Sequence, residues 1–157
     1  MIRTKVVNVF QAFDGAFILL TESLSSIILE HCLDDKDTIQ DYKMFVIRTK
    51  GIFESYIQIA IEDHLLGGIV NAISKGKKLD ETERILYIME YLNIVCGRAL
   101  SEINNQVGKS SRLTVPQYIR DVTYEEPFLD GEQENLFFDS EYGKMNVSIT
   151  YHYDSER

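Results

Sequence analysis

The chain has 157 residues, of which 45% are hydrophobic and 11% aromatic, and this composition is typical of a folded protein with a substantial core. We expect one domain over residues 1–157. The formal net charge of −9 speaks against nucleic acid and anionic membranes as the main partners, because both require a cationic patch.

The first helical pattern runs from about Arg3 to Cys32, with apolar residues at near-helical spacing that only Gly15 interrupts. It is too polar for a signal peptide or a membrane span. Within it we expect His31 to lie in the core. The two cysteines, Cys32 and Cys96, both fall on apolar helical stripes, which indicates buried, reduced thiols and a cytoplasmic location.

A charged connection, Asp34 to Asp41, separates this helix from two strand patterns. The strands cover Tyr42 to Lys50 and Ile52 to Ile61, and the second alternates cleanly between apolar and polar residues. Gly51 between them predicts a tight hairpin turn. A short apolar helix is predicted next, over His64 to Ser74.

The longest pattern is an amphipathic helix from Asp80 to Gly108, with Asp80 and Glu83 as a capping box and Gly108 as the C-terminal stop. Its apolar stripe is flanked by a second row of residues: Glu90, Asn93, Gly97, Ser101 and Asn104. A face that serves only solubility normally carries Lys, Arg and Glu. We therefore expect the function on this row.

The remainder of the chain reads as strands and turns. The stretch from Leu113 to Tyr124 contains a Thr-Val-Pro entry followed by the β-prone residues Tyr118, Ile119 and Val122. A turn-rich stretch with Pro127 and Gly131 follows, and Glu134 to Asp139 pairs with Lys144 to Tyr153 as a terminal hairpin. The order of elements predicts an α+β domain with a largely antiparallel sheet and helices packed on one face.

Residues Glu90 to Gly97 spell E-x-x-N-I-V-x-G, and this motif resembles the signature of the CheX chemotaxis phosphatases, which are relatives of CheC and FliY. The resemblance extends over roughly residues 42 to 151. It includes the hairpin at Gly51, the helix that carries Gly67 and Gly68, and the segment with Pro116 after the long helix.

The resemblance implies a phosphatase that acts on the phospho-aspartate of a CheY-type receiver domain, with Glu90 and Asn93 as catalytic residues. An acyl phosphate is already activated, and the receiver supplies Mg²⁺ and a lysine, so the phosphatase needs only to place a water in line. One end of the Asn93 amide can accept a hydrogen bond from the water while the other end donates one, and neither bond requires a particular pKa. Glu90 is suited to pairing with the receiver's lysine. We expect no cofactor or metal of the protein's own.

We expect Gly97, Leu86 and Ser101 to bind the partner. Gly97 either lets the receiver approach the helix closely or relieves crowding between helix and sheet. The family often carries Ser or Asp where this chain has Leu86, and this departure leaves an alternative: a weak or inactive CheX-like module that binds a receiver or another signalling partner. The resemblance also implies a homodimer. His31, His64 and His152 lie in separate elements, which predicts no metal site.

Overall fold

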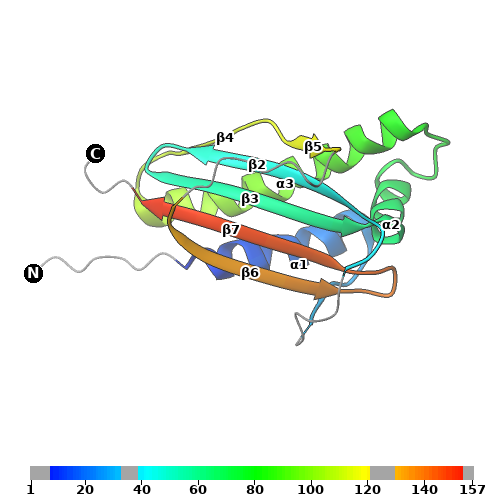
Figure 1. Ribbon diagram of the computed structural model, residues 1–157, viewed down its shortest axis with the longest axis horizontal. Helices are drawn as coiled ribbons and strands as arrows, with labels where there is room; N and C mark the ends of the chain where they lie inside the picture. The colour runs from blue at the N-terminus through cyan, green and yellow to red at the C-terminus, as the bar shows by residue number, and fades with distance from the viewer. Residues whose placement is uncertain (1–7, 33–38, 121–129, 154–157) are drawn as a thin grey trace, which may run out of the picture.

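The computed structural model describes residues 8–32, 39–120 and 130–153. Within these ranges the chain forms three α-helices and a seven-stranded sheet whose pairs are all antiparallel. Helices α1 (Val9–Ser25) and α3 (Glu81–Val107) cross one face of the sheet, and α2 (Asp63–Ile73) lies at one end (Figure 1). The predicted α+β fold with a largely antiparallel sheet is confirmed. No helix among the described residues is long and apolar enough to cross a membrane.

The sheet has the strand order β1-β6-β7-β3-β2-β4, and β5 also pairs with β2. The two predicted hairpins form its centre. The strand bounds are β1 (Glu30–His31), β2 (Tyr42–Lys50), β3 (Phe53–Glu62), β4 (Arg112–Leu113), β5 (Gln117–Ile119), β6 (Glu132–Asp139) and β7 (Met145–Tyr153).

The core lies between the sheet and the helical layer. Ile57 in the middle of β3 pairs with Ile47 of β2 and Ile149 of β7, and all three side chains are fully buried. Residues two apart along β3, such as Ile59 and Ile61, share this face because side chains alternate along a strand. Removal of this apolar surface from water is the main force that holds α1 and α3 on the sheet.

The first helix ends at Ser25, whereas the sequence predicts a helix that continues to Cys32. Ser26 adopts the left-handed conformation with φ 61°, and the Ser25 hydroxyl accepts a hydrogen bond from the Ile27 amide at 3.3 Å. Serine hydroxyls offer the backbone this alternative to a further helical turn. The predicted start, Arg3 to Val7, lies outside the described residues.

The early end of α1 corrects two further predictions. His31 is exposed on β1, not buried in the core, and its Nε2 lies 2.6 Å from Asp14 Oδ1 of α1. Cys32 is half-buried beyond β1 and not on a helical stripe, and its amide donates to the Phe137 carbonyl at 2.8 Å. Cys96 is fully buried in α3 as predicted, and burial raises the pKa of its thiol to about 12.

Lys43 of β2 joins the first turns of two helices. Its Nζ donates to Asp63 Oδ1 of α2 at 2.9 Å and lies 3.9 Å from Glu81 Oε1 of α3. The hydrogen bond to Asp63 is the largest of the causes that raise the pKa of Lys43 above its ordinary value of 10.5. Because the folded-state pKa is the higher one, the stabilisation is complete below pH 10.5 and is lost as the pH rises through the raised pKa.

We therefore expect Asp63→Asn to lower the free energy of unfolding at neutral pH, and we expect part of this loss to vanish above pH 10.5. The part that remains reflects the first turn of α2, where a negatively charged side chain is favoured by the partial positive charge of the helix N-terminus. Urea denaturation of both proteins across the alkaline range measures the difference. A difference that stays constant from neutral to strongly alkaline pH would show that Lys43 and Asp63 are not coupled.

Candidate functional site

The long helix α3 carries the candidate site, and both of its ends are fixed by local hydrogen bonds. The Glu83 amide donates to Asp80 Oδ1 at 2.8 Å, and the Asp80 amide donates to Glu83 Oε1 at 3.0 Å. At the other end Gly108 has φ 82° and its amide donates to the Asn104 carbonyl at 2.8 Å. The predicted capping box and glycine stop are confirmed, and α3 is a well-defined scaffold.

The buried face of α3 sets its rotation about its own axis. Tyr91, Leu92 and Val95 are all fully buried, and the Tyr91 hydroxyl shares a 2.6 Å hydrogen bond with the Thr21 hydroxyl of α1. Desolvation raises the pKa of Tyr91 far above its ordinary range, so the phenol stays neutral and available for this bond. With this face turned inward, the flank that carries Asn93 is turned to solvent.

Glu90 and Asn93 lie one turn apart on that outward flank and are both exposed. Neither side chain has a hydrogen bond or an ion pair with any residue that the structure describes. Both functional groups are therefore available to a partner. Their roles stay predictions, and the geometry places them together as the sequence spacing predicts.

Gly97 and Ser101 continue the same flank. A Cβ atom added at Gly97 would have no neighbouring atom within 4 Å, so this glycine does not relieve crowding between helix and sheet. That alternative is wrong, and the open space above the backbone is compatible with close approach of another molecule. Ser101 is exposed two turns beyond Asn93, and its predicted contact with a partner stays a prediction.

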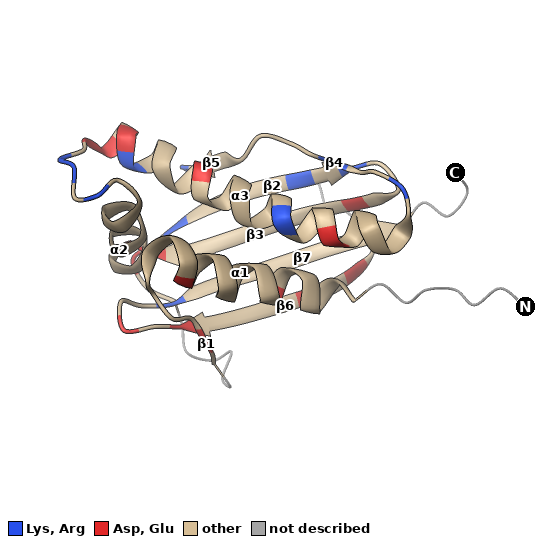
Figure 2. Cartoon of the chain, turned by 180° about the vertical axis from the view of Figure 1, so that it is seen from behind, with Lys and Arg blue, Asp and Glu red and all other residues tan. Residues whose placement is uncertain are grey.

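A groove of about 300 Å³ runs along this flank. One wall comes from α3, and the other comes from the segment that follows it, which lies alongside α3 together with β4 and β5 (Figure 2). Leu86 is 58% exposed on the helical wall, and Val115 is 80% exposed on the opposite wall. The lining residues are Leu86, Met89, Glu90, Asn93, Leu113, Thr114, Val115 and Pro116.

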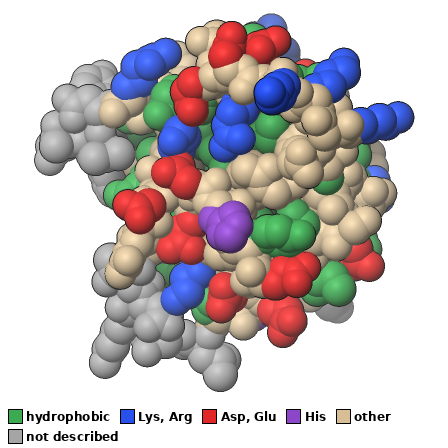
Figure 3. Space-filling model, turned by 90° about the vertical axis from the view of Figure 1, so that its right-hand side faces the viewer, with side chains coloured by type: hydrophobic (Ala, Val, Ile, Leu, Met, Phe, Trp, Pro, Cys, Tyr) green, Lys and Arg blue, Asp and Glu red, His purple; other side chains and the backbone are tan. Residues whose placement is uncertain are grey.

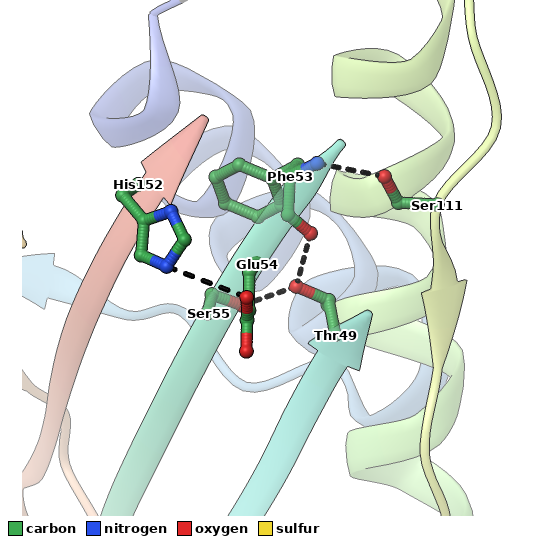
Figure 4. Close-up of polar contacts among 6 residues, drawn as sticks. All are labelled: Thr49, Phe53, Glu54, Ser55, Ser111 and His152. Carbon is green, nitrogen blue, oxygen red and sulfur yellow. Dashed lines mark hydrogen bonds and ion pairs between the residues drawn. The ribbon is translucent and has the colours of Figure 1, made fainter. Parts of the chain in front are cut away.

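Hydrogen bonds fix this second wall to the fold. The Asn104 side chain accepts from the Ser111 amide at 2.9 Å and donates to the Ser111 carbonyl at 3.2 Å. The Ser111 hydroxyl in turn accepts from the Phe53 amide of β3 at 2.9 Å (Figure 4). Further along, Thr114 and Arg48 exchange two hydrogen bonds, from the Arg48 amide to Thr114 Oγ1 and from the Thr114 amide to the Arg48 carbonyl.

Asn104 is thus a positioning residue for the groove wall and not a contact residue in the functional row. We expect Asn104→Ala to lower the free energy of unfolding by about 1–3 kcal/mol, because it leaves the backbone N–H and C=O of the buried Ser111 without these partners. Hydrogen exchange should show faster exchange of the Ser111 amide. Unchanged protection of that amide would mean that the wall is held by other contacts.

The sequence predicts β-prone residues after the Thr-Val-Pro entry, and β5 (Gln117–Ile119) lies at that place, whereas the short strand β4 before the entry is not predicted. Two short strands, β4 and β5, pair with opposite ends of β2, and residues 114–116 between them form the wall of the groove. Pro116 has no amide proton to donate to a sheet ladder, which is the available sequence signal for the interruption. Residues 121–124 lie outside the described residues.

His64 is exposed as predicted, and no group of three or more His, Cys, Asp or Glu side chains that could hold a metal ion occurs within residues 8–32, 39–120 and 130–153. His152 Nε2 lies 3.3 Å from Glu54 Oε1 on the sheet, and neither residue belongs to α3 (Figure 4). The predicted homodimer stays a prediction.

No protein-family model matches the chain, and no curated protein is similar enough in sequence to count as a match. Solved structures do match. The structure resembles chemotaxis protein CheX from Vibrio vulnificus, with 17% identity, a TM-score of 0.76, and coverage of 93% of this chain and 100% of that one. It resembles CheX from Desulfovibrio desulfuricans at 13% identity, with a TM-score of 0.75 and coverage of 93% and 100%.

A third similar structure is the complex of CheX with CheY, BeF₃ and Mg²⁺ from Borrelia burgdorferi, at 14% identity, with a TM-score of 0.70 and coverage of 94% of this chain and 99% of that one. A CheC-like protein from Shewanella shares the same fold. At these identities the likeness shows the fold. The chain therefore has the CheX/CheC-like fold that the motif on α3 predicts.

Proposed function

We propose that this protein hydrolyses the phospho-aspartate of a CheY-type receiver domain. One observation carries the proposal: Glu90 and Asn93 stand side by side on the outward flank of a rigid helix, beside a groove, with no partner among the described residues. The CheX/CheC-like fold supports it, and so does the Borrelia burgdorferi complex, in which a protein of this fold is bound to CheY.

In the proposed reaction Asn93 holds a water in line with the bond from phosphorus to the aspartyl oxygen. The amide oxygen accepts a hydrogen bond from the water, and the amide nitrogen can donate to an oxygen of the phosphoryl group. The water oxygen bonds to phosphorus, the aspartate leaves as a carboxylate, and inorganic phosphate is released. The phosphoryl charge is balanced by Mg²⁺ and lysine of the receiver, so this chain supplies no metal and no nucleophile.

Glu90 acts through position and charge. Its carboxylate lies one turn before Asn93, where it can form an ion pair with the lysine of the receiver and fix the docked orientation. The geometry of the amide matters because a displacement of about 1 Å can lower a rate by about 100-fold.

A second candidate function is a receiver-binding module without hydrolysis. Leu86 favours it: this side chain is 58% exposed one turn before Glu90, where the related motif often has a small polar residue. A large apolar side chain there strengthens docking through buried surface, and it does not help to orient a carboxylate.

Phosphate release from a phosphorylated CheY-type receiver tests the proposal, with wild type compared with Glu90→Gln. We expect wild type to accelerate release and Glu90→Gln to raise the KM, because the isosteric amide keeps the shape and loses the charge. Release at the spontaneous rate, together with measurable binding of the receiver, would favour the binding module. Equal KM values for the two proteins would contradict the role given to Glu90.

A further inference from the structure

A second, larger pocket adjoins the groove at the start of α3. Its volume is about 610 Å³, and it lies between the first turns of α3 and the strands β2 and β5. Figure 3 shows this end of the molecule, where hydrophobic side chains are visible between basic and acidic ones. The lining residues are Lys43, Glu81, Thr82, Ile85, Leu86, Met89, Tyr118 and Arg120.

The two cations in this pocket differ in what they contact. Lys43 already forms ion pairs with Asp63 and Glu81. Arg120 is exposed and lies over the Tyr118 ring, with its Cζ 5.4 Å from the ring centroid, and it forms no ion pair with any residue in the described part of the chain. With respect to the described residues, the pocket therefore offers one guanidinium that has no ion-pair partner and that lies near apolar side chains. That combination fits a hydrophobic side chain next to a carboxylate, because a guanidinium pairs with a carboxylate through two parallel hydrogen bonds.

The pocket and the groove share Leu86 and Met89, so they form one continuous surface. Leu86 and Glu90 are four residues apart, which is a rise of about 6 Å along the helix. A stable protein interface buries about 800 Å² on each partner, which is more than the groove alone offers. A partner of that size seated over Glu90 and Asn93 can therefore extend over the adjoining pocket.

From this we propose that the pocket is a second anchoring point for the receiver, and that it takes an apolar side chain of the receiver whose neighbouring carboxylate pairs with Arg120. This inference rests on the proposed function, since it assumes that the receiver docks over Glu90 and Asn93. The net charge of this protein is −9, so most of its surface charge repels an acidic partner. The positive charge of Arg120 is therefore a favourable contact for a carboxylate of the receiver.

The test is the affinity for a receiver treated with beryllium fluoride and Mg²⁺, measured by titration calorimetry for wild type, Arg120→Glu and Arg98→Glu. Arg98 is an exposed arginine on α3 that lines neither the pocket nor the groove. Arg98→Glu changes the net charge by the same amount as Arg120→Glu, so it serves as the matched control. We expect Arg120→Glu to weaken binding about three- to tenfold and Arg98→Glu to change it less than about twofold. Arg120→Lys should lie between wild type and Arg120→Glu, because it keeps the charge and loses the paired hydrogen bonds.

The outcomes distinguish failure of the anchoring role from failure of the proposed function. Equal weakening by Arg120→Glu and Arg98→Glu would overturn the anchoring role and leave the proposed phosphatase intact, since only net charge would then matter. No binding of the activated receiver by wild type would overturn both. Added salt should reduce the difference between the two variants, because exposed charges are screened. A difference that does not respond to salt would contradict an ion pair at Arg120.

Discussion

Asn93→Ala is expected to lower the rate of phosphate release at saturating receiver by about 100-fold, to nearly the spontaneous rate, while the affinity for the receiver changes little. The reason is that the Asn93 amide holds the attacking water in the proposed mechanism. This water is in place only in the reacting complex, so its loss affects the rate more than the affinity. Because Asn93 is exposed and has no partner among the described residues, alanine should leave the free energy of unfolding unchanged or slightly higher.

Asn105→Ala is the matched control for this variant. Asn105 is also an exposed asparagine on α3, and it does not line the groove. We expect it to release phosphate at the wild-type rate. Rapid-quench or phosphate-sensor kinetics at several receiver concentrations separate the rate at saturation from the KM. Full activity of Asn93→Ala would remove the amide from the mechanism, and equal losses in both variants would point to an effect on the helix as a whole.

Tyr91→Ala is expected to lower the free energy of unfolding by about 3–5 kcal/mol, the usual cost of removing a fully buried aromatic ring from a core. Tyr91 is among the largest fully buried side chains, and it packs α3 against α1 and the sheet. The substitution opens a cavity and also removes the partner of the Thr21 hydroxyl, which is itself fully buried. Urea denaturation followed by circular dichroism measures the loss.

Two companion variants divide this loss between packing and hydrogen bonding. Tyr91→Phe keeps most of the ring volume and leaves the Thr21 hydroxyl unpaired, so we expect a loss of about 1–3 kcal/mol. Combining it with Thr21→Val removes both hydroxyls, and we expect part of that loss to be recovered. A loss for Tyr91→Phe as large as for Tyr91→Ala would mean that the hydrogen bond, and not the packing, holds α3 in place.

The parts of the fold that sequence predicts well are those with local signals. The ends of α3 follow from Asp80, Glu83 and Gly108, which form their capping bonds within a few residues. The hairpin of β2 and β3 follows from alternation and from Gly51, whose φ of 128° is one that other residues rarely adopt. The spacing of Glu90 and Asn93 on one flank of α3 is likewise a local property.

The parts that sequence does not predict depend on contacts between distant residues. The end of α1 at Ser25 lies within an apolar pattern that continues for several residues, and the short strand β1 becomes visible only through its pairing with β6. Asn104 belongs by spacing to the functional row, yet its side chain is used by Ser111 seven residues later. The second wall of the groove and the pocket at Arg120 arise only when the segment after α3 folds back along β2.

The most direct test of the central claim is a turnover experiment, in which wild-type protein is mixed with a large molar excess of phosphorylated CheY-type receiver and Mg²⁺. The account predicts that each protein molecule releases many phosphates, faster than the receiver loses phosphate alone, and that Asn93→Ala abolishes the acceleration. Binding of the receiver without any increase in phosphate release would contradict the account and leave a docking module on a CheX/CheC-like fold.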